Sequence, residues 1–155
     1  LQHRREAPVI NAFKDWLNKV TDEILIESAT QVVEDLKVNG PYFSGEFEDN
    51  WAVVPGNTDI SGSKKSGTRP KVARAPRVTK TAVPKPRNNK LTIGNRMEYK
   101  LIAQDLIPGR IKEGGTGSAN QDWYSLYLSG KINDSLKEGV ERASQNSEIR
   151  NYKGT

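Results

Sequence analysis

The sequence predicts an α+β fold, in which a long N-terminal helix and a C-terminal helix pack on a small antiparallel sheet with a long basic insertion. Three observations lead to this expectation. Apolar residues recur at helical steps near both ends of the chain, over residues 8–38 and 120–144. Between them, residues 46–54 alternate in polarity as a strand does, and residues 91–94 have the character of a short strand. A basic segment rich in Pro, Gly, Ser and Thr separates these two stretches.

The first element is predicted to be a helix of about 30 residues, from Pro8 to Val38, because its apolar residues follow the three- and four-residue steps of one helical face. Pro8 suits a first helical turn, and Asn39-Gly40-Pro41 predicts a left-handed cap followed by a residue that cannot continue the helix. Such a helix would be ~45 Å long, which exceeds the usual width of a domain of this size. We therefore expect a break or bend near Thr21-Asp22.

The sheet is expected from two short stretches. Glu46 to Val54 alternates in polarity as a strand does and ends at Pro55-Gly56, and Leu91 to Gly94 has the character of a second strand. Met97 to Leu106 fits a further strand or a short helix equally well. From Asn120 to about Ser144 the apolar residues again follow a helical step, so we expect this closing helix to pack against the first.

The most unusual feature of the composition is the segment of residues 56–90. It holds ten basic residues against one acid, Asp59, which is a charge of +9 in a chain whose net charge is +5. The remaining residues therefore sum to −4. Four prolines within the segment exclude a persistent helix. A thin hairpin that pairs Val72 to Ala75 with Thr79 to Val83 would suit its alternating Val, Thr, Lys and Arg residues.

We expect these residues to form an arm that projects from a single domain, 1–155, with residues 8–55 and 91–145 as the body. Ten cations could neutralise phosphates, contact acidic surfaces of neighbouring subunits, or remain solvated, and these alternatives stay open. The expected contact residues are Lys64, Lys65, Arg69, Lys71, Arg74, Arg77, Lys80, Lys85, Arg87 and Lys90.

Residues that could carry chemistry are few. The chain has no cysteine and one histidine, His3, so disulfides and thiolate metal sites are excluded and no nucleophile-base pair is evident. We expect no catalytic, cofactor or metal site, no enzyme activity, and no membrane partner, since no run approaches the roughly 20 apolar residues of a span. Solvated faces are expected for the acids Asp22, Glu23, Glu27, Glu46 and Glu48, and core positions for the aromatics Phe13, Trp16, Phe47, Trp51, Tyr99, Trp123 and Tyr127.

The turn after the first helix is Gly40-Pro41-Tyr42-Phe43-Ser44-Gly45-Glu46-Phe47. It resembles the Ala-Pro-x-x-Thr-Gly-x-Leu type of turn in neck or tail-completion proteins of tailed bacteriophages, with Pro41, Ser44, Gly45 and Phe47 at the matching places. In that family a strand, a variable insertion, a strand pair and a last helix follow. The later segment Ile93 to Tyr99 is similar through Tyr99, but Lys100 stands where the family has a small residue.

The resemblance implies a structural virion protein that forms a homo-oligomeric ring in the phage neck and is assembled in the host cytoplasm. Its partners would be the head connector or head-closure protein and the tail terminator or tail tube, with non-specific contact to passing DNA. Pro41, Ser44 and Gly45 would shape the turn, since Gly45 permits a positive φ and Ser44 can bond backbone amides. Two alternatives stay open: a tail terminator ring, and a nucleic-acid-binding protein with a basic extension.

Overall fold

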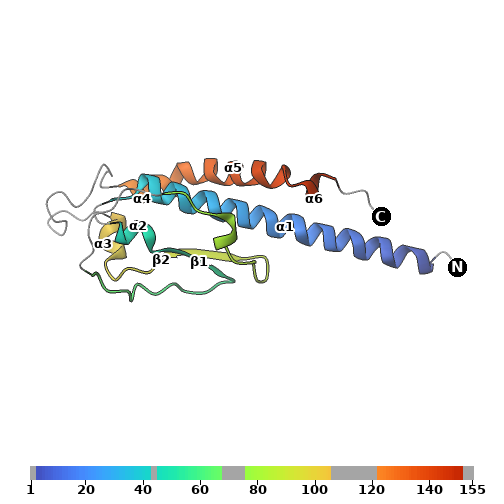
Figure 1. Ribbon diagram of the computed structural model, residues 1–155, viewed down its shortest axis with the longest axis horizontal. Helices are drawn as coiled ribbons and strands as arrows, with labels where there is room; N and C mark the ends of the chain where they lie inside the picture. Colours follow the sequence, from blue (N-terminus) through green and yellow to red (C-terminus); the bar gives the residue numbers. More distant parts are fainter. Residues whose placement is uncertain (1–2, 43–44, 68–75, 106–121, 152–155) are drawn as a thin grey trace.

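The α+β prediction is confirmed by the computed structural model, which describes residues 3–42, 45–67, 76–105 and 122–151. Three layers lie on one another (Figure 1). The long helix α1 is the middle layer, the C-terminal helix α5 runs beside it, and a two-stranded antiparallel sheet covers its other side. The main elements are α1 (His3–Asn39), β1 (Trp51–Pro55), β2 (Leu91–Asn95) and α5 (Ile132–Ser144).

Helix α1 is one continuous helix of 37 residues, so the break expected near Thr21-Asp22 is absent. The Thr21 hydroxyl donates a hydrogen bond to the Leu17 carbonyl (2.9 Å), which satisfies it within the helix instead of capping a new one. Because the helix begins at His3, Pro8 lies inside it and not at its first turn.

The end of α1 also differs from the prediction in its cause. Gly40 N donates to Leu36 O (3.0 Å), but Gly40 lacks the left-handed φ that was expected. A Cβ at this position would lie 2.8 Å from Leu36 O and 3.0 Å from the Trp123 ring. Glycine is therefore required here for close packing, while Pro41 is buried directly after it.

The predicted strand from Glu46 to Val54 is wrong in its first half, where a short helix, α2 (Glu46–Asp49), replaces it. Gly45 begins this helix with φ 89°, the positive value expected for it. The turn directs Phe47 into the core and buries Glu48, which was expected to face solvent. β1 then pairs with β2 in a register that runs from Trp51 opposite Asn95 to Pro55 opposite Leu91.

The core lies between the three layers. The Phe47 ring packs edge-on against Trp51 and Trp123, with ring centroids 5.5 and 6.3 Å apart. Asn95 is fully buried and donates from Nδ2 to Phe47 O (2.7 Å), which ties the sheet to the turn. The buried cluster consists of Val32, Val33, Leu36, Phe47, Trp51, Met97, Ala103, Trp123 and Tyr127.

The remaining elements complete the body. Of the two alternatives for Met97 to Leu106, the structure has a helix, α3 (Lys100–Asp105). The predicted closing helix is confirmed in its position against α1, although a π-helical segment divides it. Its parts are α4 (Trp123–Leu126), the π-helix η2 (Tyr127–Lys131) and α5, and α6 (Ser147–Arg150) follows; the glycine-rich loop of residues 114–118 lies outside the described residues.

Candidate functional site

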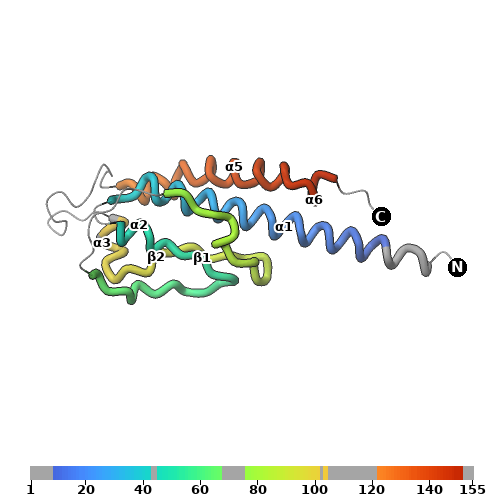
Figure 2. Tube along the Cα trace, viewed as in Figure 1, coloured from blue at the N-terminus to red at the C-terminus, as the bar shows by residue number. Residues whose placement is uncertain are grey.

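The first described part of the basic segment, residues 56–67, lies along the body (Figure 2). Ile60 is buried, and Lys100 Nζ donates to its carbonyl oxygen (2.7 Å). Lys64 pairs in parallel with Met97, since Lys64 N donates to Arg96 O and Glu98 N donates to Lys64 O, both at 2.9 Å. These residues therefore do not project as the expected arm.

The second described part, residues 76–90, crosses α1 as a strap. Val83 is buried, and Val78 N donates to the Glu34 carboxylate (3.0 Å). The 3-10 helix η1 (Lys80–Ala82) occupies the place where one strand of a hairpin was expected, and the other strand, 72–75, lies outside the described residues. The strap is thus packed on the body through both backbone and side-chain contacts.

Ion pairs fasten this strap to α1. Lys80 Nζ bonds Glu23 Oε1 and lies 3.3 Å from Glu27 Oε1, and Lys85 Nζ lies 3.9 Å from Asp22 Oδ2. The Glu23 and Glu27 side chains are only 14% and 15% exposed, so they do not form the solvated face predicted for them. Charge complementarity between the basic segment and acidic residues is therefore present within one chain.

The other described cations do not gather into one patch. Lys64 and Lys65 lie beside the C-terminal end of β2, near Met97. Arg87 and Lys90 pair through their backbones in an antiparallel β-bridge at the opposite end of that strand. Strand rise over the intervening residues separates the two groups by roughly 20 Å. Arg77 is exposed before η1, and the predicted residues Arg69, Lys71 and Arg74 lie outside the described residues.

Of the three predicted turn residues, Pro41 and Gly45 are described and Ser44 is not. Gly45 leads directly into Glu46, whose carboxylate accepts from Ser66 Oγ and Gly67 N, both at 2.9 Å. The turn thus holds the last residues of the first described part of the basic segment. Its position next to Phe47 couples that contact to the core.

One surface that sequence reasoning missed lies on the N-terminal end of α1. Phe13 was expected in the core, but four large apolar side chains here are each 46–54% exposed. α1 extends past the end of α6 (Figure 1), and the Trp16 indole, which donates to Ile149 O (3.3 Å), marks the place where the two helices meet. We call this surface the α1 stripe; it consists of Val9, Ile10, Phe13 and Leu17.

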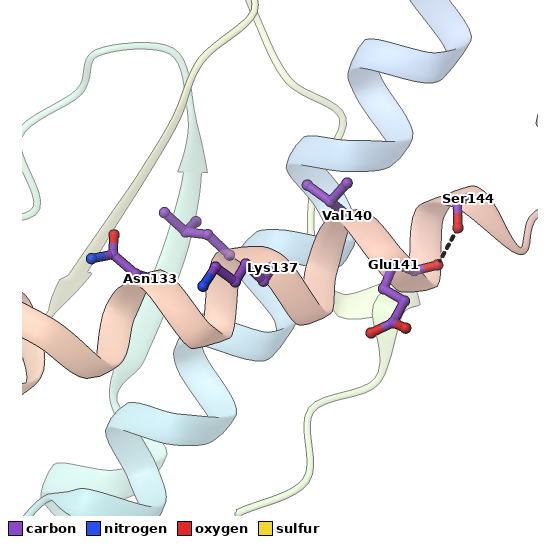
Figure 3. A pocket seen from close by; sticks show the side chains of 6 residues that line it. Asn133, Lys137, Val140, Glu141 and Ser144 are labelled. Atoms are coloured by element: carbon purple, nitrogen blue, oxygen red, sulfur yellow. Dashed lines mark hydrogen bonds between the residues drawn. The ribbon is translucent and has the colours of Figure 1, made fainter.

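A second apolar surface lies on α5. One side of α5, Ser135, Gly139 and Ala143, is buried, and Gly139 packs against Ser28 of α1. The adjacent side carries Leu136 and Val140, which are 42% and 48% exposed. Together with polar neighbours they line a shallow groove, the α5 groove, formed by Asn133, Leu136, Lys137, Val140, Glu141 and Ser144 (Figure 3).

A buried polar network joins the two helices near this groove. The Tyr127 hydroxyl and Ser135 Oγ are 2.8 Å apart, and Ser135 Oγ donates to Asp35 Oδ2 (2.6 Å). Burial raises the pKa of Tyr127 to about 12, and the negative charge of Asp35 adds to this rise, while the Ser135 hydrogen bond opposes it. The network fixes α5 on α1 and therefore fixes the orientation of the groove.

Within the described ranges there is no cluster of three or more His, Cys, Asp or Glu side chains arranged to hold a metal ion. No helix in this part of the chain has the length and apolar character that crossing a bilayer requires. Comparisons with family models, with curated proteins and with solved structures give no match to this chain.

Proposed function

We propose that this protein is a structural subunit that assembles into a closed ring. The observation that carries the proposal is the pair of exposed apolar surfaces, the α1 stripe and the α5 groove, which lie on different elements of one small body. Two different complementary surfaces on one chain favour head-to-tail contacts, and such contacts close into rings when the rotation between neighbours permits it.

The energetics favour assembly over a monomer that keeps both surfaces exposed. Complete burial of a Val, Leu, Ile or Phe side chain contributes about 1.5–3 kcal/mol, so a half-exposed one contributes roughly 1 kcal/mol when a neighbour covers it. The α1 stripe alone offers four such side chains. Against an association cost of about 4–15 kcal/mol, one interface is marginal, and closure of a ring adds a last interface without bringing in a further subunit.

The particular ring that we propose is the neck ring of a tailed bacteriophage, which joins the head connector to the tail. Support comes from the turn resemblance, with Gly45 at φ 89°, and from the part of the element order that agrees: a long helix, a strand, an insertion, a strand and a closing helix. Helix α3 stands where the family has the second strand of a pair. The exposed cations Lys64, Lys65 and Arg87 would then face connector, tail or passing DNA.

The test is assembly of the purified full chain. Mass photometry over a concentration series, followed by negative-stain microscopy, is expected to show a discrete closed ring, alone or after addition of connector and tail-tube proteins from a tailed phage. A monomer under all of these conditions would overturn the proposal. Stable attachment to tail tubes but never to connectors would assign the protein to the tail terminator instead.

A second candidate function is non-specific nucleic-acid binding. The observation in its favour is that Lys64, Lys65, Arg87 and Lys90 are all exposed. They occupy two ends of the sheet, which suits contact with separate phosphates along a backbone more than a single anion site.

A further inference from the structure

We infer that the α1 stripe of one copy docks into the α5 groove of a second copy. This inference rests on the proposed self-assembly and adds the contact that makes it. Four properties of the two surfaces favour this contact: the helical phase of the stripe, its distance from the groove of its own chain, the charge around each surface, and the apolar area.

The helical phase shows what kind of partner the α1 stripe accepts. Ser28 and Asp35 both contact α5, through Gly139 and Ser135 respectively, and they are seven residues apart. Seven residues are nearly two helical turns, so residues at this spacing lie on one side of a helix. Ile10, Leu17 and Ile24 share that spacing, and Ile24 lies one turn before Ser28. The stripe therefore lies on the same side of α1 that packs against α5 at Ser28 and Asp35.

Reach decides whose α5 groove the stripe can meet. In its own chain, Val140 is next to Gly139, which lies on Ser28. Phe13 is fifteen residues before Ser28 on the continuous helix α1, a separation of about 22 Å along the axis. The stripe cannot reach its own groove, so its occupant is another molecule. A second copy supplies a helix with exposed apolar residues at a four-residue step, Leu136 and Val140.

Charge favours this pairing. Residues 3–19 of α1 contain four basic and two acidic residues, whereas α5 contains three acidic and two basic ones. The exposed charged residues in and beside the α1 stripe are Lys14, Asp15 and Lys19, and those of α5 are Asp134, Lys137 and Glu141. The groove lining itself holds one charge of each sign, Lys137 and Glu141. The two helix surfaces thus carry small net charges of opposite sign, which favours their association over contacts of each surface with itself.

The area fits a small contact. On the stripe, four side chains that are each about half exposed offer about 400 Å² of apolar surface, against the roughly 800 Å² that each partner buries in a standard interface. The groove offers less, since Leu136 and Val140 are the two large apolar residues that line it. Polar residues around both surfaces therefore supply much of the buried area.

The chain has no cysteine, so single substitutions give clean crosslinking. We would mix Phe13→Cys protein with Val140→Cys protein, oxidise the mixture, and resolve the products under denaturing conditions. A covalent dimer between the two variants is expected. The matched control replaces Val140→Cys with Leu101→Cys, a residue on α3 that is 65% exposed and outside both surfaces, and this mixture is expected to give at least fivefold less dimer.

The outcomes separate this inference from the ring itself. Covalent homodimer of Phe13→Cys, without any dimer that joins the two variants in the mixture, would show stripe-to-stripe contact and overturn the docking. Leu17→Asp and Val140→Asp are each expected to abolish assembly, while Leu101→Asp keeps it; circular dichroism checks that all three fold. If rings persist in both the stripe variant and the groove variant, the ring proposal stands and the docking inference is overturned. A wild-type chain that never assembles would overturn both, and a stripe that binds only connector protein would overturn the docking.

Discussion

Gly139 of α5 lies directly against Ser28 of α1, with no space for a methyl group between them. A Cβ built on Gly139 would overlap the Ser28 backbone and lie 2.5 Å from its Oγ. Together with Ser135 and Ala143, this glycine gives α5 a side of small residues against the long helix. The separation of the two helices is therefore set by the absence of a side chain at one position.

Gly139→Ala is expected to destabilise the fold by about 1–3 kcal/mol, because backbone atoms of α1 must move to admit the methyl group. Gly130→Ala is the matched control, since nothing lies within 4 Å of a Cβ at that position. It is expected to leave stability unchanged or to raise it by about 0.5–1 kcal/mol through the better helix propensity of alanine. Urea unfolding of both variants measures the difference, and equal midpoints would contradict the packing argument.

Lys80→Met is expected to destabilise the protein by about 1–2 kcal/mol, because it leaves the largely buried carboxylates of Glu23 and Glu27 without their cation. Lys85→Met removes a 3.9 Å pair whose lysine is 83% exposed, and its expected effect is close to zero. Chemical denaturation at moderate salt compares the two. A larger loss from Lys85→Met would contradict the role given to Lys80.

The raised pKa of Tyr127 predicts that the folded protein loses stability at alkaline pH. Its pKa in the folded protein is about 12 against an ordinary value of 10, so the unfolded chain loses the proton first as pH rises. This effect costs no stability below pH 10, and between pH 10 and 12 it lowers the free energy of unfolding by an amount that reaches about 2–3 kcal/mol. Unfolding free energies measured from pH 8 to 12 are expected to fall across this window.

Tyr127→Phe tests this assignment. The variant is expected to be about 1 kcal/mol less stable at pH 8, because the hydroxyl contact with Ser135 is lost, but to fall less steeply above pH 10. Tyr99, whose pKa burial and the charges of Glu46 and Glu98 raise to about 12, leaves a residual slope. Parallel profiles for wild type and variant would show that Tyr127 does not contribute to the alkaline loss.

Nucleic-acid binding can be tested by substitution of exposed cations, with circular dichroism to check the fold, since Arg87 also donates to Pro55 O and Thr58 Oγ1. A variant with Lys64, Lys65, Arg87 and Lys90 all changed to Gln keeps the buried Ile60 and Val83, which deletion of the segment would remove. If the chain binds duplex DNA, the variant is expected to bind more weakly than wild type. The magnitude of its slope of log K against log salt is expected to be smaller by up to ~3–4. Lys80→Gln is the control, since Lys80 already pairs with Glu23 and Glu27. Identical salt slopes in wild type and variant would show that these four cations do not contact the DNA phosphates.

The elements of the fold followed from local patterns, and the errors came from contacts between distant residues. Helical period predicted α1 and the closing helix, and alternation predicted β1. The same alternation in Glu46 to Asp49 was misleading, because Gly45 at positive φ starts a helix that turns Phe47 into the core. Gly40 is glycine because Trp123 lies against it, and nothing near residue 40 in the sequence signals that contact.

The site could be predicted only in part. Composition identified the basic segment, but its path depends on pairing of Lys80 with acids more than fifty residues earlier, which no local pattern encodes. The exposure of Phe13 was equally hidden, because the apolar period of α1 is the same whether its own chain or a neighbour covers it. The covered and the exposed parts of α1 are distinguished only by the point where α6 ends.

Because α1 is unbroken from its buried half to the stripe, the direction in which a neighbour is met is fixed by helical phase. One extra residue placed between Leu17 and Ile24 would turn the stripe by about 100° about the axis while the core stayed as it is. In the proposed ring, the subunits would then join along a different direction, and a closed circle would become an open spiral. The curvature of such a ring would thus be encoded in the residue count of a single helix.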